Sequence, residues 1–178
     1  MICAVIPTRF HPPELARLLG VLASDGVCTH LVVAAQDSED RLHEMWNDAC
    51  DAAEAHGASS IAVLKDDIAI LPGTLPLFAS LLAGDPRLGV VHPDSAAADW
   101  NLPTGLPLLD RERPLSEACF MLHAAAGVRF DEPLHFDQQF DRDLRAAGWD
   151  IACVIGVPYR DAADCSTNRG RVGASTNR

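Results

Sequence analysis

Four short apolar runs, separated by segments with helical periodicity, constrain the fold of this chain more than any other feature. The runs are rich in Val, Ile, Leu and Ala and have the length of buried strands. Between them, apolar residues recur at intervals of three and four, as on helices that pack against a sheet. Alternating strands and helices favour a parallel sheet with right-handed crossovers, so the expected class is α/β. The predicted strands cover residues 2–7, 30–35, 61–64 and 89–92.

Helix start and stop signals lie between these predicted strands. Pro12-Pro13-Glu14 suits a first helical turn, because proline is tolerated there and a carboxylate favours the positive end of a helix. Ser38 is placed to cap a second helix, which ends at Gly57, and Pro72-Gly73-Thr74 introduces a third. The second half of the chain adds a strand, a helix and a strand over residues 118–123, 137–147 and 151–155.

Two segments show no regular period. Residues 93–116 contain four prolines, and a loop of this length in a small domain is usually functional or mobile. Residues 156–178 are mostly polar and contain Ser-Thr-Asn-Arg twice. We therefore expect one domain over residues 1–155, followed by a mobile tail over residues 156–178.

Charge and cysteine content narrow the partners and the compartment. A net charge of −11 argues against nucleic acid as a partner, because binding to its phosphates needs a basic face. No stretch approaches the roughly 18 apolar residues of a membrane span, and the first residues lack the basic start of a secretory signal. The six cysteines are scattered without a Cys-x-x-Cys pair, which favours free thiols. We expect a cytoplasmic protein.

Polar residues follow the first three predicted strands. In a parallel α/β sheet, ligands bind beyond the carboxyl ends of the strands, so these side chains are the first candidates for a site. The candidates are Thr8, Arg9, Gln36, Asp37, Asp66 and Asp67.

Asp66 and Asp67 are the sharpest local feature. Two carboxylates directly after a buried strand are costly unless they are solvated, paired or bound to a cation. Mg²⁺ and Mn²⁺ prefer oxygen ligands and often bridge carboxylates to the phosphates of a substrate. From the spacing alone, a solvated turn after the strand is the more common outcome.

A second acidic segment surrounds the start of the helix predicted at residue 137. Acidic residues at this point are often only favourable partners of the helix dipole. A catalytic interpretation needs one carboxylate that is free to take a proton from an attacking hydroxyl group. Asp137 is the candidate for that role, whereas Asp141 and Asp143 are expected to face solvent.

Five groups of residues, taken in order, carry a resemblance. They are Val5-Ile6-Pro7-Thr8-Arg9 with Pro13–Leu19, Trp46-Asn47 with Leu64–Ile68, Leu71-Pro72-Gly73 with Pro86–Asp94, Gly127–Glu132 with His135-Phe136-Asp137, and Arg145–Trp149. Together they resemble family-two glycosyltransferases over residues 1 to about 155, although no single group is diagnostic. The resemblance implies the GT-A fold, a Rossmann-like α/β architecture whose mostly parallel central sheet has helices on both faces.

The resemblance also implies an activity and a set of residues. The activity is transfer, with inversion, of a sugar from a nucleoside-diphosphate sugar of the UDP or GDP type, assisted by Mn²⁺ or Mg²⁺. Asp67, with Asp66, would hold the metal, and Asp137 would deprotonate the acceptor hydroxyl. The residues carried over to nucleotide-sugar binding are Pro7, Thr8, Arg9, Gln36, Asp37, Lys65 and Asp66.

The acceptor side is the least defined part of the resemblance. Its candidates are Asp131, Glu132 and His135, together with Trp100, which lies among polar neighbours in the long loop and suits a sugar platform. The short chain leaves little acceptor-side structure, so a large or exposed acceptor such as a glycan or a protein is expected. A homodimer would supply further walls.

Four departures from the family pattern keep a second function open. Ala35 replaces an acid at the end of the second strand, Lys65 stands where Asn or Asp is frequent, Gln139 interrupts the acidic motif, and no His follows residue 135. These changes are compatible with a nucleotide-sugar-binding protein that has lost catalysis. A nucleotidyltransferase fits less well, because Phe10-His11-Pro12-Pro13 is unlike a glycine-rich, basic loop that holds a triphosphate.

Overall fold

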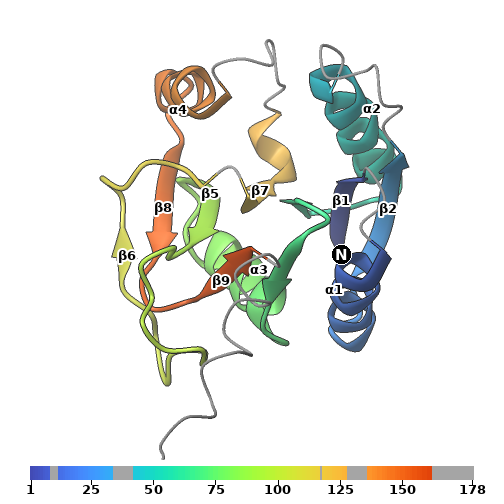
Figure 1. Ribbon diagram of the computed structural model, residues 1–178. Coiled ribbons are helices and arrows are strands. Elements are labelled where there is room, and N and C mark those ends of the chain that lie inside the picture. Colours follow the sequence, from blue (N-terminus) through green and yellow to red (C-terminus); the bar gives the residue numbers. More distant parts are fainter. Residues whose placement is uncertain (9–11, 34–41, 117, 128–135, 162–178) are drawn as a thin grey trace, which may run out of the picture.

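A computed structural model describes residues 1–8, 12–33, 42–116, 118–127 and 136–161 (Figure 1). The helices are α1 (Pro12–Ser24), α2 (Leu42–Ala55), α3 (Thr74–Gly84) and α4 (Phe136–Ala146), with a short 3₁₀ helix, η2 (Ala124–Ala126). The strands are β1 (Ile2–Thr8), β2 (Cys28–Val33), β3 (Ser60–Leu64), β4 (Ile68–Ile70), β5 (Leu88–Pro93), β6 (Leu109–Asp110), β7 (Cys119–His123), β8 (Asp150–Val154) and β9 (Tyr159–Asp161).

The central sheet is mostly parallel, as the sequence predicts. Its seven strands are ordered β2-β1-β3-β7-β5-β8-β6, and β4 pairs with β9 in a separate small sheet. Strand β1 is parallel to both β2 and β3, and β5 is parallel to β8. Strand β7 is inserted antiparallel between β3 and β5, and β6 is antiparallel to β8. The α/β class is confirmed, whereas β4, β6 and β9 have no counterpart among the predicted strands.

Helices cover both faces of the sheet because successive side chains of a strand point to opposite faces. Ala4 and Ile6 of β1 belong to a core that includes α1 and α3, where Phe78 is completely buried. Cys3 and Val5 belong to a second core, which includes residues of α2 and α4. Burying one side chain of the size of Phe78 stabilises the fold by about 1.5–3 kcal/mol, so these two faces hold the layers together.

Arginine side chains fix the long segment between β5 and β7. Arg111 forms ion pairs with Asp85, at 2.7 Å, and with Asp150 at the start of β8. Arg113 forms an ion pair with the buried Asp94 and lies 3.3 Å from Asp110. The segment over 93–116, which the sequence predicts as a long loop without regular structure, contains the short strand β6 and is tied to the sheet.

The described fold extends past the predicted domain boundary at residue 155. Tyr159, Arg160 and Asp161 form β9 and pair with Ile70, Ala69 and Ile68 of β4. Residues 162–178 lie outside the described part of the chain, so a mobile tail there stays a prediction. Among the described residues, no helix has the length and apolar character needed to cross a membrane. The five cysteines that fall in the described ranges are free thiols.

Gly89 gives a direct test of the packing between β5 and the residues before β8. A Cβ atom added there would lie 2.8 Å from Cβ and 3.0 Å from Cγ of Trp149. We expect Gly89→Ala to lower the free energy of unfolding by about 1–3 kcal/mol, the usual cost of overpacking. Denaturant unfolding measures the change, with Gly20→Ala in α1 as control, since nothing lies within 4 Å of that Cβ. A Gly89→Ala protein at least as stable as Gly20→Ala would contradict this packing.

Candidate functional site

The candidate site lies at one edge of the central sheet. Strands β1, β3, β5 and β8 run in the same direction, so the residues at their carboxyl ends share an edge. Thr8 is the last residue of β1, Asp66 follows β3 by two positions, and Asp94 directly follows β5. All three side chains are buried, with exposed fractions of 1%, 6% and 5%.

Thr8 and Asp66 are in direct contact. The Thr8 hydroxyl donates a hydrogen bond of 2.6 Å to Oδ2 of Asp66. Buried carboxylates are costly unless they are hydrogen-bonded, so this contact helps to hold Asp66 in place. It joins the first strand to the turn after the third, two parts of the chain that the sequence assigns to one ligand site.

The three residues Lys65, Asp66 and Asp67 differ in exposure. Asp66 is buried, Asp67 is partly exposed and Lys65 is exposed. The backbone N–H of Lys65 donates to the carbonyl of Ala118 at 3.0 Å, which joins the end of β3 to the residue before β7. Asp67 therefore presents a carboxylate at the surface, beside one that is already engaged inside.

Asp67 has the chemistry of a ligand for a hard divalent cation. Such ions are commonly held by one or two carboxylates together with the phosphates of a substrate. Among the residues that the structure describes, no group of three or more His, Cys, Asp and Glu side chains is arranged to hold a metal ion. A metal here would need the phosphates of a ligand to complete its coordination, and Asp67 fits that arrangement better than Asp66, whose Oδ2 accepts from Thr8.

Strand β4 begins directly after Asp67 and pairs with β9 in the small two-stranded sheet. The guanidinium carbon of Arg160 in β9 lies 4.6 Å from the centre of the Trp100 ring, within the range of a cation–π contact. The ring that the sequence suggests as a sugar platform thus packs against a cation of the chain. A sugar that stacked on the same face would have to displace Arg160, and the acceptor role of Trp100 stays a prediction.

A cavity of about 480 Å³ adjoins this edge on the side of β5 and β8. Its polar lining comes from segments far apart in the sequence, and apolar residues including Leu115 and Ala118 complete it. The polar side chains are Lys65, His92, Ser95, Arg113, Ser116, Cys153 and Tyr159.

His92 is almost completely buried in the lining of that cavity, with an exposed fraction of 2%. Its Nδ1 lies 3.1 Å from the carbonyl oxygen of Pro93, and since a carbonyl only accepts, Nδ1 carries the proton. Burial lowers the pKa of His92, so the ring is neutral at pH 7 and Nε2 is an acceptor. No described protein group hydrogen-bonds to Nε2.

Asp94 and Cys153 complete the electrostatics around the cavity. Burial raises the pKa of Asp94, but N–H groups of Gly156 and Ala96 and the guanidinium of Arg113 outweigh it, so the pKa lies below its ordinary value. Burial raises the pKa of the Cys153 thiol to about 11, so this side chain is neutral. The negative charge on Asp94 is thus already shared with Arg113.

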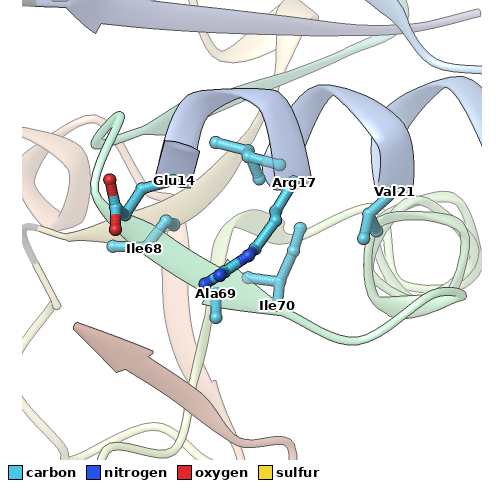
Figure 2. A pocket seen from close by; sticks show the side chains of 7 residues that line it. Glu14, Arg17, Val21, Ile68, Ala69 and Ile70 are labelled. Atoms are coloured by element: carbon cyan, nitrogen blue, oxygen red, sulfur yellow. The ribbon is translucent and has the colours of Figure 1, made fainter. Parts of the chain in front are cut away.

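A second cavity of about 210 Å³ lies between α1 and β4. Its walls are mainly apolar, from Leu18, Val21, Ile68, Ala69 and Ile70. Figure 2 shows Arg17 extending from α1 towards Ala69 and Ile70, with Glu14 near Ile68. Because a nucleotide or a charged sugar needs several polar partners, this cavity is a poorer candidate than the edge beside Asp66.

Asp137 is the second residue of α4, a helix that packs against the central sheet. The ring centres of Phe140 and Phe120 are 6.0 Å apart, and Phe120 lies opposite Val63, one position before the end of β3. At the other end of α4, the guanidinium of Arg145 donates to the carbonyl of Arg111 at 3.0 Å. Asp137 precedes Phe140 by nearly one turn, so its backbone lies within about one turn of the residue that packs on Phe120.

Several predicted site residues lie outside the described part of the chain. They are Arg9, Gln36, Asp37, Asp131, Glu132 and His135. Their assignments stay predictions, as does the role of the Asp137 side chain. In contrast, Pro7 and Thr8 lie in β1, and the structure brings Thr8, Lys65, Asp66 and Asp67 to one edge.

Sequence reasoning missed the cavity beside Lys65. It gave His92, Arg113, Ser116 and Tyr159 no role in a site. The one available signal was the order His92-Pro93-Asp94 at the end of a buried strand, because charged and titratable residues at that position of a parallel sheet often face a ligand site.

Comparison with known proteins identifies the fold. No protein-family profile and no curated protein matches the sequence. Among solved structures, S. aureus TarS 1–349 in complex with UDP-GlcNAc matches with a TM-score of 0.60 and 14% identity, over 89% of this chain and 57% of that one. A197 from STIV matches with a TM-score of 0.62 and 10% identity, over 90% of this chain and 84% of that one.

These likenesses confirm a GT-A-like fold with its Rossmann-like central sheet. A glycosyltransferase involved in the glycosylation of the major capsid of PBCV-1 overlaps less well, with a TM-score of 0.47 and 12% identity over 70% of this chain and 61% of that one. The fold assignment rests on the first two structures. This chain spans a little more than half of the TarS chain it matches, at 57%.

Proposed function

We propose that this chain is a glycosyltransferase that moves a sugar from a nucleoside-diphosphate sugar to an acceptor hydroxyl group. The observation that carries the proposal is the buried contact between Thr8 and Asp66, beside the partly exposed Asp67, at the ligand-binding edge of a GT-A-like sheet. The likeness in fold to TarS, whose structure contains UDP-GlcNAc, supports a nucleotide-sugar donor of this type.

The donor would lie across the carboxyl ends of β1 and β3. Pro7 and Thr8 end β1, and Asp66 is fixed there by the Thr8 hydroxyl. One oxygen of Asp66 accepts from Thr8, so its carboxylate is positioned in advance to accept a hydrogen bond from a ribose hydroxyl. Arg9, Gln36 and Asp37 belong to the same proposed pocket by their place in the sequence.

Asp67 would hold Mn²⁺ or Mg²⁺ together with the two phosphates of the donor. When bound, such an ion stabilises the negative charge that develops on the leaving diphosphate. The partial exposure of Asp67 leaves its carboxylate accessible to a ligand from solvent. Asp66, held inside by Thr8, would support this position from the interior.

Transfer with inversion needs one base and a single displacement. The acceptor hydroxyl attacks the anomeric carbon, its proton passes to a carboxylate, and the bond to the leaving diphosphate breaks. Asp137 is the proposed base, because it matches by position the carboxylate that takes the proton in the glycosyltransferases that the sequence resembles, and a general base must lie within hydrogen-bond reach of that proton.

Calorimetric titration of UDP and GDP, with and without Mn²⁺, tests the donor site. We expect Mn²⁺-dependent binding of one nucleotide to the wild-type protein and a loss of at least tenfold in affinity in Asp67→Ala. Asp48→Ala removes an exposed carboxylate from α2 and serves as the matched control, with unchanged affinity expected. Absence of binding of both nucleotides under every metal condition would refute the donor site.

The same titration separates an enzyme from a binding protein that has lost catalysis. Metal-dependent nucleotide binding, followed by sugar release or transfer from a matching nucleotide sugar, supports the enzyme. Binding without turnover for any donor and acceptor would favour the inactive protein, for which Ala35, Lys65 and Gln139 are the sequence evidence.

A further inference from the structure

The cavity beside Lys65 has a chemistry that the donor site does not explain. Its volume of about 480 Å³ lies within the range of small-molecule pockets. The described residues that line it include two cations and no carboxylate, in a chain whose net charge is −11. The charged side chains of the lining itself are thus opposite in sign to the net charge of the chain.

Lys65 carries a positive charge that has no ion-pair partner among the described residues. Arg113 already faces Asp94 and Asp110, and the three together carry no excess positive charge. In the described part of the chain, no carboxylate pairs with the Lys65 ammonium, and its backbone N–H bonds to Ala118. Since the side chain is exposed at the cavity, it is free to move onto an anion.

His92 and Tyr159 add hydrogen-bonding groups of opposite kinds. The neutral His92 has an acceptor at Nε2 that is almost completely covered and has no described protein donor, so a hydroxyl group of a ligand would satisfy it once the ring turned towards the cavity. Ser116 donates to the Tyr159 oxygen at 3.0 Å, which leaves the phenolic proton of Tyr159 available to an anion or a hydroxyl group. A ligand with hydroxyl groups and a negative charge matches both sets of groups.

The position of the cavity relates it to the second substrate. Lys65 directly precedes Asp66, whereas Thr8, on the other strand beside β3, binds the far side of Asp66. In a single displacement, the acceptor hydroxyl attacks from the side opposite the leaving diphosphate. A cavity across the Lys65–Asp67 turn from β1 is therefore placed for the acceptor.

We propose that this cavity binds the acceptor through an acidic group, so that the acceptor is a sugar that carries a carboxylate or a phosphate. The Lys65 ammonium contacts the acidic group, Tyr159 donates to it, and His92 accepts from a neighbouring hydroxyl group. The term acceptor depends on the proposed transferase function, whereas binding of an acidic sugar at Lys65 does not.

Titration of the nucleotide-free, metal-free protein with glucuronate, glucose 6-phosphate and glucose tests this proposal by calorimetry and by ¹H–¹⁵N correlation spectra. We expect at least one acid to bind tenfold or more tightly than glucose, with shifts of the amides of Ser116, Ala118 and Tyr159. The tighter acid identifies carboxylate or phosphate as the recognised group. Lys65→Gln is expected to weaken binding of that acid at least fivefold.

Arg87→Gln, which removes an exposed cation at the opposite end of β5, is the matched control and should leave the affinity unchanged. Equal affinity for glucose and both acids, shifts confined to other amides, or an unaltered affinity in Lys65→Gln would each overturn the proposal. So would a Lys65→Gln protein that loses only nucleotide affinity, because Lys65 would then belong to the donor site.

If a nucleotide binds and no acid does, the acidic acceptor fails while the donor site stands. If an acid binds and no nucleotide does, the donor site fails while binding of an acidic sugar at Lys65 stands.

Discussion

Asp137→Asn is expected to lower the rate of sugar transfer by about 10²–10⁴-fold, the usual contribution of a positioned general base. Asparagine keeps the size of the side chain but does not take a proton at neutral pH. Because the proton leaves the acceptor only during the displacement, we expect the loss in kcat, with little change in KM for the donor. Steady-state rates with a matched donor and acceptor, together with nucleotide titration of the variant, measure the two parts separately.

Asp143→Asn is the matched control for this experiment. It makes the same chemical change on the same helix, at an exposed side chain that follows Asp137 by less than two turns of α4. Its transfer rate should stay within about twofold of the wild-type rate, since a surface substitution away from the site changes little. An Asp137→Asn enzyme within threefold of the wild type would exclude Asp137 as the base and direct attention to other carboxylates near the edge.

The elements of the fold were predictable because their signals are local. Strand β3 and its continuation into Lys65-Asp66-Asp67 follow from one apolar run, and α1 follows from proline, Glu14 and a leucine period. Composition also predicted strand β7, but it did not predict the direction of that strand in the sheet. An antiparallel strand between β3 and β5 depends on where the chain returns after 93–116, which no local pattern records.

The short strands were missed for a related reason. β4 and β9 have three residues each, and each is stabilised by the other across some ninety positions of sequence. A segment such as Tyr159–Asp161 has no periodicity long enough to detect, so it was assigned to the tail. Tertiary pairing, rather than local propensity, decides its structure.

The candidate site also has one part that local sequence predicts and another part that it does not. Thr8, Asp66 and Asp67 were predictable because each follows a strand directly and the ends of parallel strands meet at one edge. The cavity that contains His92, Arg113 and Tyr159 combines three distant segments, and its character depends on burial and pairing. Sequence shows that Lys65 departs from the pattern of the family that the chain resembles, but only the arrangement shows that it lines a cavity without an ion-pair partner among the described residues.

Asp94→Ala is expected to cause the largest loss of stability in this part of the molecule. The Asp94 carboxylate is buried and accepts from the N–H groups of Ala96 at 3.0 Å and Gly156 at 3.2 Å, and it also pairs with Arg113. Alanine would leave two backbone donors and one guanidinium without this acceptor. Because hydrogen bonds to charged groups contribute about 1.5–3 kcal/mol each in favourable cases, we expect a net loss of about 2–3 kcal/mol.

Denaturant unfolding of Asp94→Ala and Asp94→Asn at several pH values tests this interpretation. The two N–H groups donate to different oxygens of Asp94, and asparagine retains one of these acceptors, so its loss should be smaller than that of alanine. The pKa of Asp94 is lowered in the folded protein, so the unfolded chain takes up the proton first as pH falls. The stabilisation by the charge is therefore complete well above pH 3.8, the ordinary value, and disappears as pH falls through the folded pKa. The wild type and Asp94→Asn should thus differ most near neutral pH and converge in strong acid.

A difference that stayed constant down to the acid limit would show that Asp94 stabilises the fold through packing rather than through its charge. In that case the cavity beside Lys65 would not owe its lack of free negative charge to the pairing of Asp94 with Arg113.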